Sequence, residues 1–278
     1  METLVNGFKT NRAFAVTSLL VLLLLAIALA APIISPFDPT HAEMKDAFLE
    51  PSMTHLFGTD KLGRDCFSRV LYGARASLTG VLVLVASVFL VGTTMGVLSG
   101  YFGGKVDIII MRFSDMMISF PGMILAIAIA GIMGGSLVNA VIALTIVSWT
   151  KYARLARSMV LKVKRRDYVE AAIVNGGTSP HILWVHILPN ILPMMVITAA
   201  ADIGALMMEL AGLSFLGFGS QPPAPEWGLM LNEGRQQLQT APWLMIFPGL
   251  AIFVTVVVFN LWGDNLRDVL DPRNDVKD

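Results

Sequence analysis

Long uncharged runs alternate with short polar segments along this chain. A hydrocarbon core about 30 Å thick needs roughly 20 mostly apolar helical residues to cross it. One uncharged stretch, 116–150, is too long for one crossing and is broken near Gly134-Gly135-Ser136. The expected crossings are 13–37, 76–104, about 108–133, about 137–156, about 191–215 and 241–263. The pattern therefore predicts an all-α integral membrane protein with six transmembrane helices.

Basic residues gather between the fourth and fifth expected helices. They are Lys151, Arg154, Arg157, Lys162, Lys164, Arg165 and Arg166, opposed in that stretch only by Asp167 and Glu170. Cytoplasmic loops of membrane proteins carry an excess of Lys and Arg. We therefore expect this loop in the cytoplasm. Counting crossings from it places both termini in the cytoplasm and the loops about 38–75 and about 216–240 outside.

The same count gives an expected domain organisation. Residues 1–75 would hold an N-terminal cytoplasmic segment, the first helix and the first outer loop. Residues 76–273 would form a five-helix core with a cytoplasmic loop at about 160–190. Residues 274–278 would be a cytoplasmic tail.

Composition agrees with a membrane protein and excludes several functions. Hydrophobic residues make up 55% of the chain and charged residues 14%, against roughly 25% charged in soluble domains. The 20 basic and 20 acidic residues cancel, so global charge points to no nucleic-acid partner. Gly103-Gly104-Lys105-Val106 fails the phosphate-binding G-x-x-x-x-G-K-[ST] pattern. We expect no catalytic residues and no cofactor in this chain.

The expected cytoplasmic loop contains local helix and turn signals. Residues 167–174 are good helix formers, Asn175-Gly176-Gly177 supplies a left-handed stop, and Thr178-Ser179-Pro180 offers a cap with proline at the next helix start. Two short helices with a sharp turn are predicted. Such a loop is suited to dock on a cytoplasmic partner, and the alternative is an interfacial helix pair that only joins two spans.

This loop resembles the loop motif of bacterial binding-protein-dependent ABC importers. The motif reads Glu-Ala-Ala, three residues, Gly, nine residues, a hydrophobic position, one residue and Leu-Pro. Glu170-Ala171-Ala172, Gly176 and Leu188-Pro189 meet that spacing. His186 stands where isoleucine is usual, and Ile187 is expected to take its role. The resemblance implies that these residues couple the chain to an ATPase.

Further segments resemble the peptide/nickel permease branch of these importers. The carrying segments are 55–60, Gly63-Arg64-Asp65, Ser68-Arg69, 72–75, 100–104, Phe120-Pro121, 213–217, 225–228 and 264–268. The resemblance implies a helical bundle in the bacterial inner membrane. It also implies a second homologous permease, two cytoplasmic ATPase subunits carrying ATP and Mg, and an extracytoplasmic binding protein.

The outer loops contain polar residues with two interpretations. Asp60, Arg64 and Asp65 suit self-capping turns joined by local ion pairs, with contact to the binding protein as the second interpretation. Glu226 and Trp227 suit the same contact or an interfacial anchor, because Trp favours headgroup depth.

The fifth expected helix holds the candidate translocation path. Acidic groups inside a span usually face the bundle or a watery cavity. Asp202 and Glu209 are seven residues apart, so they share a helix face about 10 Å apart along the axis. Alternatively, each pairs with a neighbouring helix, or Glu209 lies near the interface. Met207 and Met208 lie beside them.

The cargo of that path has two interpretations. The run 202–212 resembles nickel-transporting members more than peptide-transporting ones, and carboxylates with Met sulfur suit transition metals. We therefore favour nickel or another chelated transition metal as the cargo. Di- or oligopeptides are the alternative, and an ion-driven secondary carrier or channel is the rival class of protein.

Overall fold

The computed structural model describes residues 11–270, and within this range the regular structure is helical. The expected tail 274–278 and the first ten residues of the expected N-terminal segment lie outside the described residues. The helices are α2 (Arg12–Ile34), α3 (Cys66–Phe102), α4 (Gly104–Ile118), α5 (Gly122–Met133), α6 (Leu137–Lys164), α7 (Asp167–Val174), α8 (Ser179–Ile182), α9 (Leu188–Phe215), α10 (Trp227–Gly234) and α11 (Trp243–Leu270). A π-helical turn, Leu183–Ile187, joins α8 to α9.

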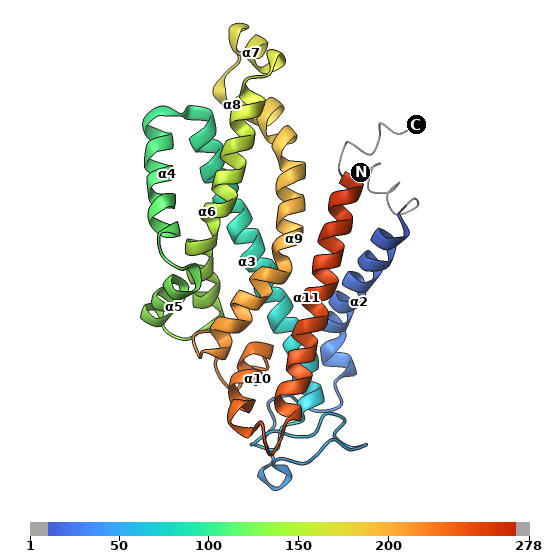
Figure 1. Cartoon of the computed structure of the whole chain (residues 1–278). Coiled ribbons are helices and arrows are strands. Elements are labelled where there is room, and N and C mark those ends of the chain that lie inside the picture. Colours follow the sequence, from blue (N-terminus) through green and yellow to red (C-terminus); the bar gives the residue numbers. More distant parts are fainter. Residues whose placement is uncertain (1–10, 271–278) are drawn as a thin grey trace.

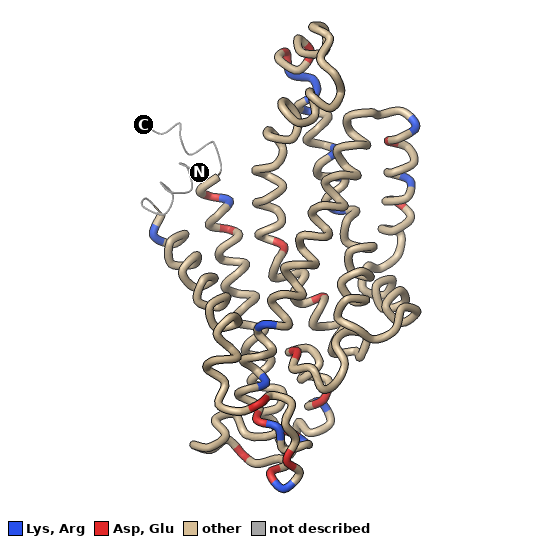
Figure 2. Tube along the Cα trace, turned by 180° about the vertical axis from the view of Figure 1, so that it is seen from behind, with Lys and Arg blue, Asp and Glu red and all other residues tan. Residues whose placement is uncertain are grey.

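The long helices run side by side, and short helices and loops form the two ends of the bundle (Figure 1). The start of α2 and the end of α11 lie on the side of α7 and α8, and α10 with the segment 35–65 lies at the opposite end. Figure 2 shows charged residues gathered at these two ends, with few along the middle of the trace. This distribution fits a bundle whose middle lies in hydrocarbon.

Four helices are long and apolar enough to cross a membrane: α2, α3, the continuous segment Ser179–Phe215 and α11. The pair α4 and α5 makes a fifth candidate if it counts as one bent span. The structure therefore supports four or five spans by length and composition, and the expected number of six is not confirmed. The helix α6 is not among the candidates, since its uncharged part, 137–150, is short and basic residues follow it.

The single helix expected at 108–133 is wrong. The chain bends by 93° between α4 and α5. Pro121 is the N-cap of α5, and proline has no backbone N–H to continue the hydrogen-bond ladder of α4. After the bend, α5 packs against α6, which begins at Leu137 after Ser136 caps it through the backbone N–H of Asn139.

The helix α3 begins ten residues before the expected start. Asp65 caps it by accepting a hydrogen bond from the backbone N–H of Ser68 at 2.8 Å. Arg69 lies inside the helix and is 1% exposed. Arginine is a good helix former, and its buried charge is tolerated there because its guanidinium is paired with Glu233 at 2.7 Å.

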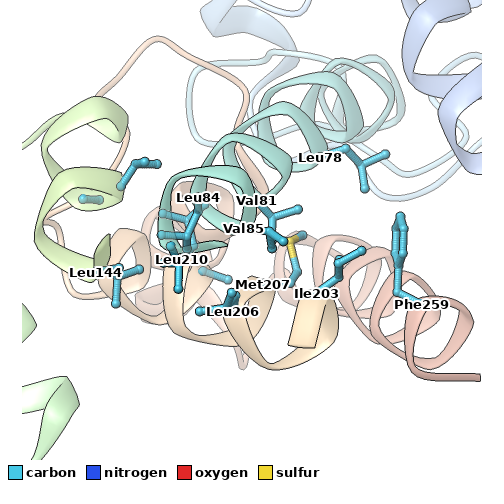
Figure 3. Packing of buried hydrophobic residues seen from close by; sticks show 14 of the residues in the cluster. Leu78, Val81, Leu84, Val85, Leu144, Ile203, Leu206, Met207, Leu210 and Phe259 are labelled. Atoms are coloured by element: carbon cyan, nitrogen blue, oxygen red, sulfur yellow. The ribbon is translucent and has the colours of Figure 1, made fainter. Parts of the chain in front are cut away.

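Small residues on α3 allow a close approach of α6. A Cβ atom at Gly96 would lie 2.3 Å from the carbonyl oxygen of Ala153, and one at Gly92 would lie 2.6 Å from that of Trp149. Glycines four residues apart are typical of packed helix pairs in membranes. Around this contact, α3, α6, α9 and α11 bury one apolar core, part of which is drawn in Figure 3.

Candidate functional site

A cavity of about 350 Å³ opens between the bend of α4 and α5, α6 and α9. It is lined by Met117, Ile118, Phe120, Gly122, Val147, Ser148, Thr150, Lys151, Tyr152, Asp202, Ala205, Leu206 and Glu209. The bend at Pro121 places Phe120 and Gly122 in this wall, so the broken helix helps to form the cavity. Its volume falls in the range of small-molecule sites.

Three charged side chains line this cavity. The Lys151 ammonium on α6 donates to both carboxylate oxygens of Asp202 on α9, at 2.7 and 2.8 Å. Glu209 shares the cavity with Asp202, as the spacing of seven residues predicted. Asp202 therefore faces the shared cavity and also pairs with a neighbouring helix. With all three groups ionised, the cavity carries a net charge of about −1.

The two methionines beside these carboxylates face elsewhere. Met207 is 1% exposed and points into the apolar core near Val85 of α3 (Figure 3). Met208 is 55% exposed and lines two other hollows, between α9 and α11. Neither sulfur therefore joins Asp202 and Glu209 in one ligand set. Among residues 11–270, no group of three or more His, Cys, Asp or Glu side chains is placed to hold a metal ion.

Sequence reasoning missed Lys151 as a part of this site. Lys151 directly follows an uncharged run in the sequence, so it is expected to belong to the basic loop. Lys151 instead lies inside α6, which ends at Lys164, and its partner Asp202 is 51 residues away in the chain. No local pattern connects residues that far apart, so only the tertiary structure reveals the pair.

The loop expected in the cytoplasm has the predicted form of two short helices around a sharp turn. The helix α7 ends at Val174, Gly176 adopts a φ of +81°, and α8 begins at Ser179. A Cβ atom at Gly176 would meet nothing within 4 Å. Glycine is therefore favoured there by its left-handed backbone and not by a lack of space.

One face of this loop is buried and the other is exposed. Val169, Ile182 and Ile187 pack in a cluster with Val97 of α3 and Val160 of α6. The remaining motif residues lie nearer the surface: Glu170, Ala171, Gly176 and Pro189 are exposed, and Ala172 and Leu188 are half-buried. The loop is thus fixed to the ends of α3 and α6 while it offers a surface to a partner. Its coupling role stays a prediction.

The end of the bundle that is expected to face outside holds a largely buried cluster of charges, which we call the outer ion cluster: Asp60, Arg64, Arg69 and Glu233. Arg64 donates to Asp60 at 2.6 Å and to Glu233 at 3.0 Å, and Arg69 donates to Glu233 at 2.7 Å. Both arginines are 1% exposed. The cluster ties the first outer loop and α3 to α10, the helix that forms within the second outer loop.

The outer residues singled out from the sequence have roles within the chain. Asp60 accepts from the backbone N–H groups of Leu62 and Arg64, and Asp65 caps α3, as the self-capping interpretation predicts. Glu226 caps α10 by accepting from the backbone N–H groups of residues 228 and 229.

Burial changes the interpretation of the outer residues. Trp227 is 3% exposed and its indole N–H donates to the carbonyl of Val70 at 2.9 Å, so it is no interfacial anchor. Asp60, Arg64, Asp65 and Glu226 are also buried. Contact with a binding protein stays a prediction, and it would have to use the exposed parts of the loops that these residues hold.

Comparisons with known proteins agree with this arrangement. Residues 92–276 match the family model described as "Binding-protein-dependent transport system inner membrane component". The chain is 45% identical to a glutathione transport system permease protein of Pectobacterium atrosepticum, over 96% of this chain and 89% of that one. It is 41% identical to a dipeptide transport system permease protein of Alkalihalophilus pseudofirmus, over 95% and 87%.

Two further comparisons concern a metal transporter and the fold. The chain is 39% identical to a nickel transport system permease protein of Escherichia coli, over 96% of this chain and 97% of that one. A solved methionine ABC transporter in an inward-facing conformation shares the fold with a TM-score of 0.59 and 20% identity, over 73% of this chain and 97% of that one. The chain therefore belongs to the family of binding-protein-dependent transport system inner membrane components, in the branch that includes peptide and nickel permeases.

Proposed function

We propose that this chain is the pore-forming permease subunit of a bacterial ABC importer, with six crossings of the inner membrane. The bent pair α4 and α5 forms the third crossing and α6 the fourth. At 1.5 Å per residue, the 28 residues of α6 reach about 42 Å, which exceeds the hydrocarbon thickness. About 20 of these residues, 137–156, would cross the hydrocarbon, so Lys151 would lie within the crossing and only the basic end of α6 would extend into the cytoplasm.

The proposed orientation places α7, α8 and both termini in the cytoplasm, in line with the basic residues of 157–166. Labelling of single cysteines tests it. Cysteine at the exposed Lys162 should react only from the cytoplasmic side, and cysteine at Met53, which is 97% exposed, only from outside. The native Cys66 is 2% exposed and should give little background. The reverse pattern would contradict the orientation.

The proposed partners follow from the family and from the exposed cytoplasmic loop. A second homologous permease would complete the pore, two ATPase subunits would dock at the loop around Glu170 and Gly176, and an extracytoplasmic binding protein would deliver the cargo. ATP and Mg would bind to the ATPase subunits. Closure of these subunits would move the loop, and the bundle would convert that movement into opening towards the binding protein.

For the cargo we propose a small peptide in preference to nickel. The observation that carries this choice is the cavity with Lys151, Asp202 and Glu209. The Lys151 ammonium already occupies both oxygens of Asp202, so only the Glu209 carboxylate is left for a metal ion, and the sulfur atoms of Met207 and Met208 face away from the carboxylates. A peptide with free ends has one ammonium and one carboxylate, which match the charges in the cavity. Relatives of both kinds exist, so relatedness alone does not decide.

Transport by the reconstituted complex tests this function. The complete complex in liposomes, supplied with its binding protein, should take up a radiolabelled dipeptide in the presence of internal ATP and Mg. Labelled nickel under the same conditions is the competing cargo. Uptake of nickel without uptake of dipeptide would overturn the peptide proposal. Uptake by this chain alone, driven by an ion gradient, would support a secondary carrier and contradict the ABC importer.

A further inference from the structure

The pair of Lys151 and Asp202 lies deep along the proposed path. Asp202 is 14 residues from the start of α9 at Leu188, or about 21 Å along the helix axis. Glu209 lies a further seven residues towards the outer end, about 10 Å away along the axis. Cargo entering from the outer side would therefore reach Glu209 first and the ion pair second.

The ion pair is poorly suited to hold the two helices together. The Lys151 side chain is 64% exposed, and the Asp202 side chain is 17% exposed. Because the Lys151 side chain is exposed, the pair contributes less to stability than an ion pair with two buried partners. Apolar residues of α6 and α9, including Leu144 and Leu210, already pack in the shared core. The pair is thus free to be replaced by other charges without loss of that packing.

We propose that Lys151 and Asp202 form an exchangeable ion pair that selects cargo with both an ammonium and a carboxylate group. This inference rests on the proposed function. The cargo ammonium takes the place of Lys151 on Asp202, and the cargo carboxylate binds the released Lys151 ammonium. Lys151, Asp202 and both cargo charges then each have a partner of opposite sign. Glu209 receives the cargo ammonium first and passes it on to Asp202.

A cargo with one charge only would leave part of the site unpaired. A peptide with a blocked amino group would take Lys151 from Asp202 and leave that carboxylate without its counter-ion. A peptide amide would bind Asp202 and leave Lys151 without a carboxylate. The four-carbon stem of lysine lets its ammonium follow the cargo carboxylate, and the cavity of about 350 Å³ has room for a small peptide.

The experiment compares three cargoes in the reconstituted complex: a free dipeptide, its N-acetyl form and its C-terminal amide. Asp202→Asn should favour the N-acetyl form, Lys151→Met the amide, and the double variant should lose the preference for the free dipeptide. Charge-assisted hydrogen bonds predict changes of about tenfold or more in relative uptake. Glu209→Gln, which keeps the ion pair, should weaken uptake of the two ammonium-bearing cargoes relative to the N-acetyl form.

The control is the pair of Arg154 and Asp115, at 2.6 Å, which joins α6 to α4 but does not line the cavity. Its neutral double variant, Arg154→Met with Asp115→Asn, should keep the preference for the free dipeptide. An unchanged preference in both the Lys151 and Asp202 variants and Glu209→Gln would overturn the inference while the permease function stands. Absence of dipeptide uptake by the wild-type complex would instead contradict the proposed function.

Discussion

A methyl group at Gly96 tests the close contact between α3 and α6. The Cβ atom of Gly96→Ala would stand 2.3 Å from the carbonyl oxygen of Ala153 and 2.7 Å from the Cβ atom of Ala156. Carbon atoms in contact prefer about 3.5 to 4.0 Å, so the helices must separate by about 1 Å. Such overpacking typically costs about 1–3 kcal/mol. The higher helix propensity of alanine returns about 1 kcal/mol, so a net loss of up to about 2 kcal/mol is expected.

The matched control is the same substitution in open space. At Gly249, near the start of α11, the nearest atom to an added Cβ is a Leu231 side-chain carbon at 4.0 Å. Gly249→Ala should therefore be neutral or stabilising by up to about 1 kcal/mol. Denaturant unfolding of the two purified variants in one detergent measures the difference. If Gly96→Ala proved as stable as Gly249→Ala, the close helix contact would be refuted.

Two further predictions concern the ends of the bundle. Glu233→Gln should lower the free energy of unfolding by about 3–5 kcal/mol, because it leaves two buried arginines with one carboxylate fewer. As a control, Glu50→Gln at an exposed position should have no effect in the same unfolding assay. The double variant Glu170→Arg, Gly176→Asp should insert normally into the membrane but lose ATPase association and stimulated ATP hydrolysis. Gly176→Asn should keep both, because asparagine tolerates a left-handed backbone. Normal stimulation of ATP hydrolysis in the double variant would contradict the coupling role.

The parts of the fold that depend on neighbouring residues could be predicted from the sequence. The helix at 167–174 and the turn at Gly176 follow from helix formers next to a left-handed stop, and both occur as expected. The common face of Asp202 and Glu209 follows from helix periodicity alone. In each case, the residues that determine the structure lie within two helical turns of one another.

The parts that depend on distant residues could not be predicted. The uncharged run that predicted α3 begins at residue 76, yet the helix begins at Cys66 and includes Arg69, whose partner Glu233 is 164 residues away. The facing of Met207 depends on which side of α9 meets α3, and periodicity does not specify that choice. The break at Pro121 is ambiguous in the sequence for another reason, since proline is tolerated inside membrane helices where neighbours satisfy the freed carbonyl groups.

Two helical segments of similar length, 151–164 of α6 and 188–202 of α9, connect the loop of α7 and α8 to the ion pair. Lys151 lies 13 residues before the end of α6 and Asp202 lies 14 residues after the start of α9, so each segment is about 20 Å long. A movement of the loop that spreads these helix ends would also separate the Lys151 ammonium from Asp202 and open the site to exchange. Spin labels at the exposed Lys162 and Asn190 should therefore change their separation when the complex binds ATP, and an unchanged separation would contradict this connection.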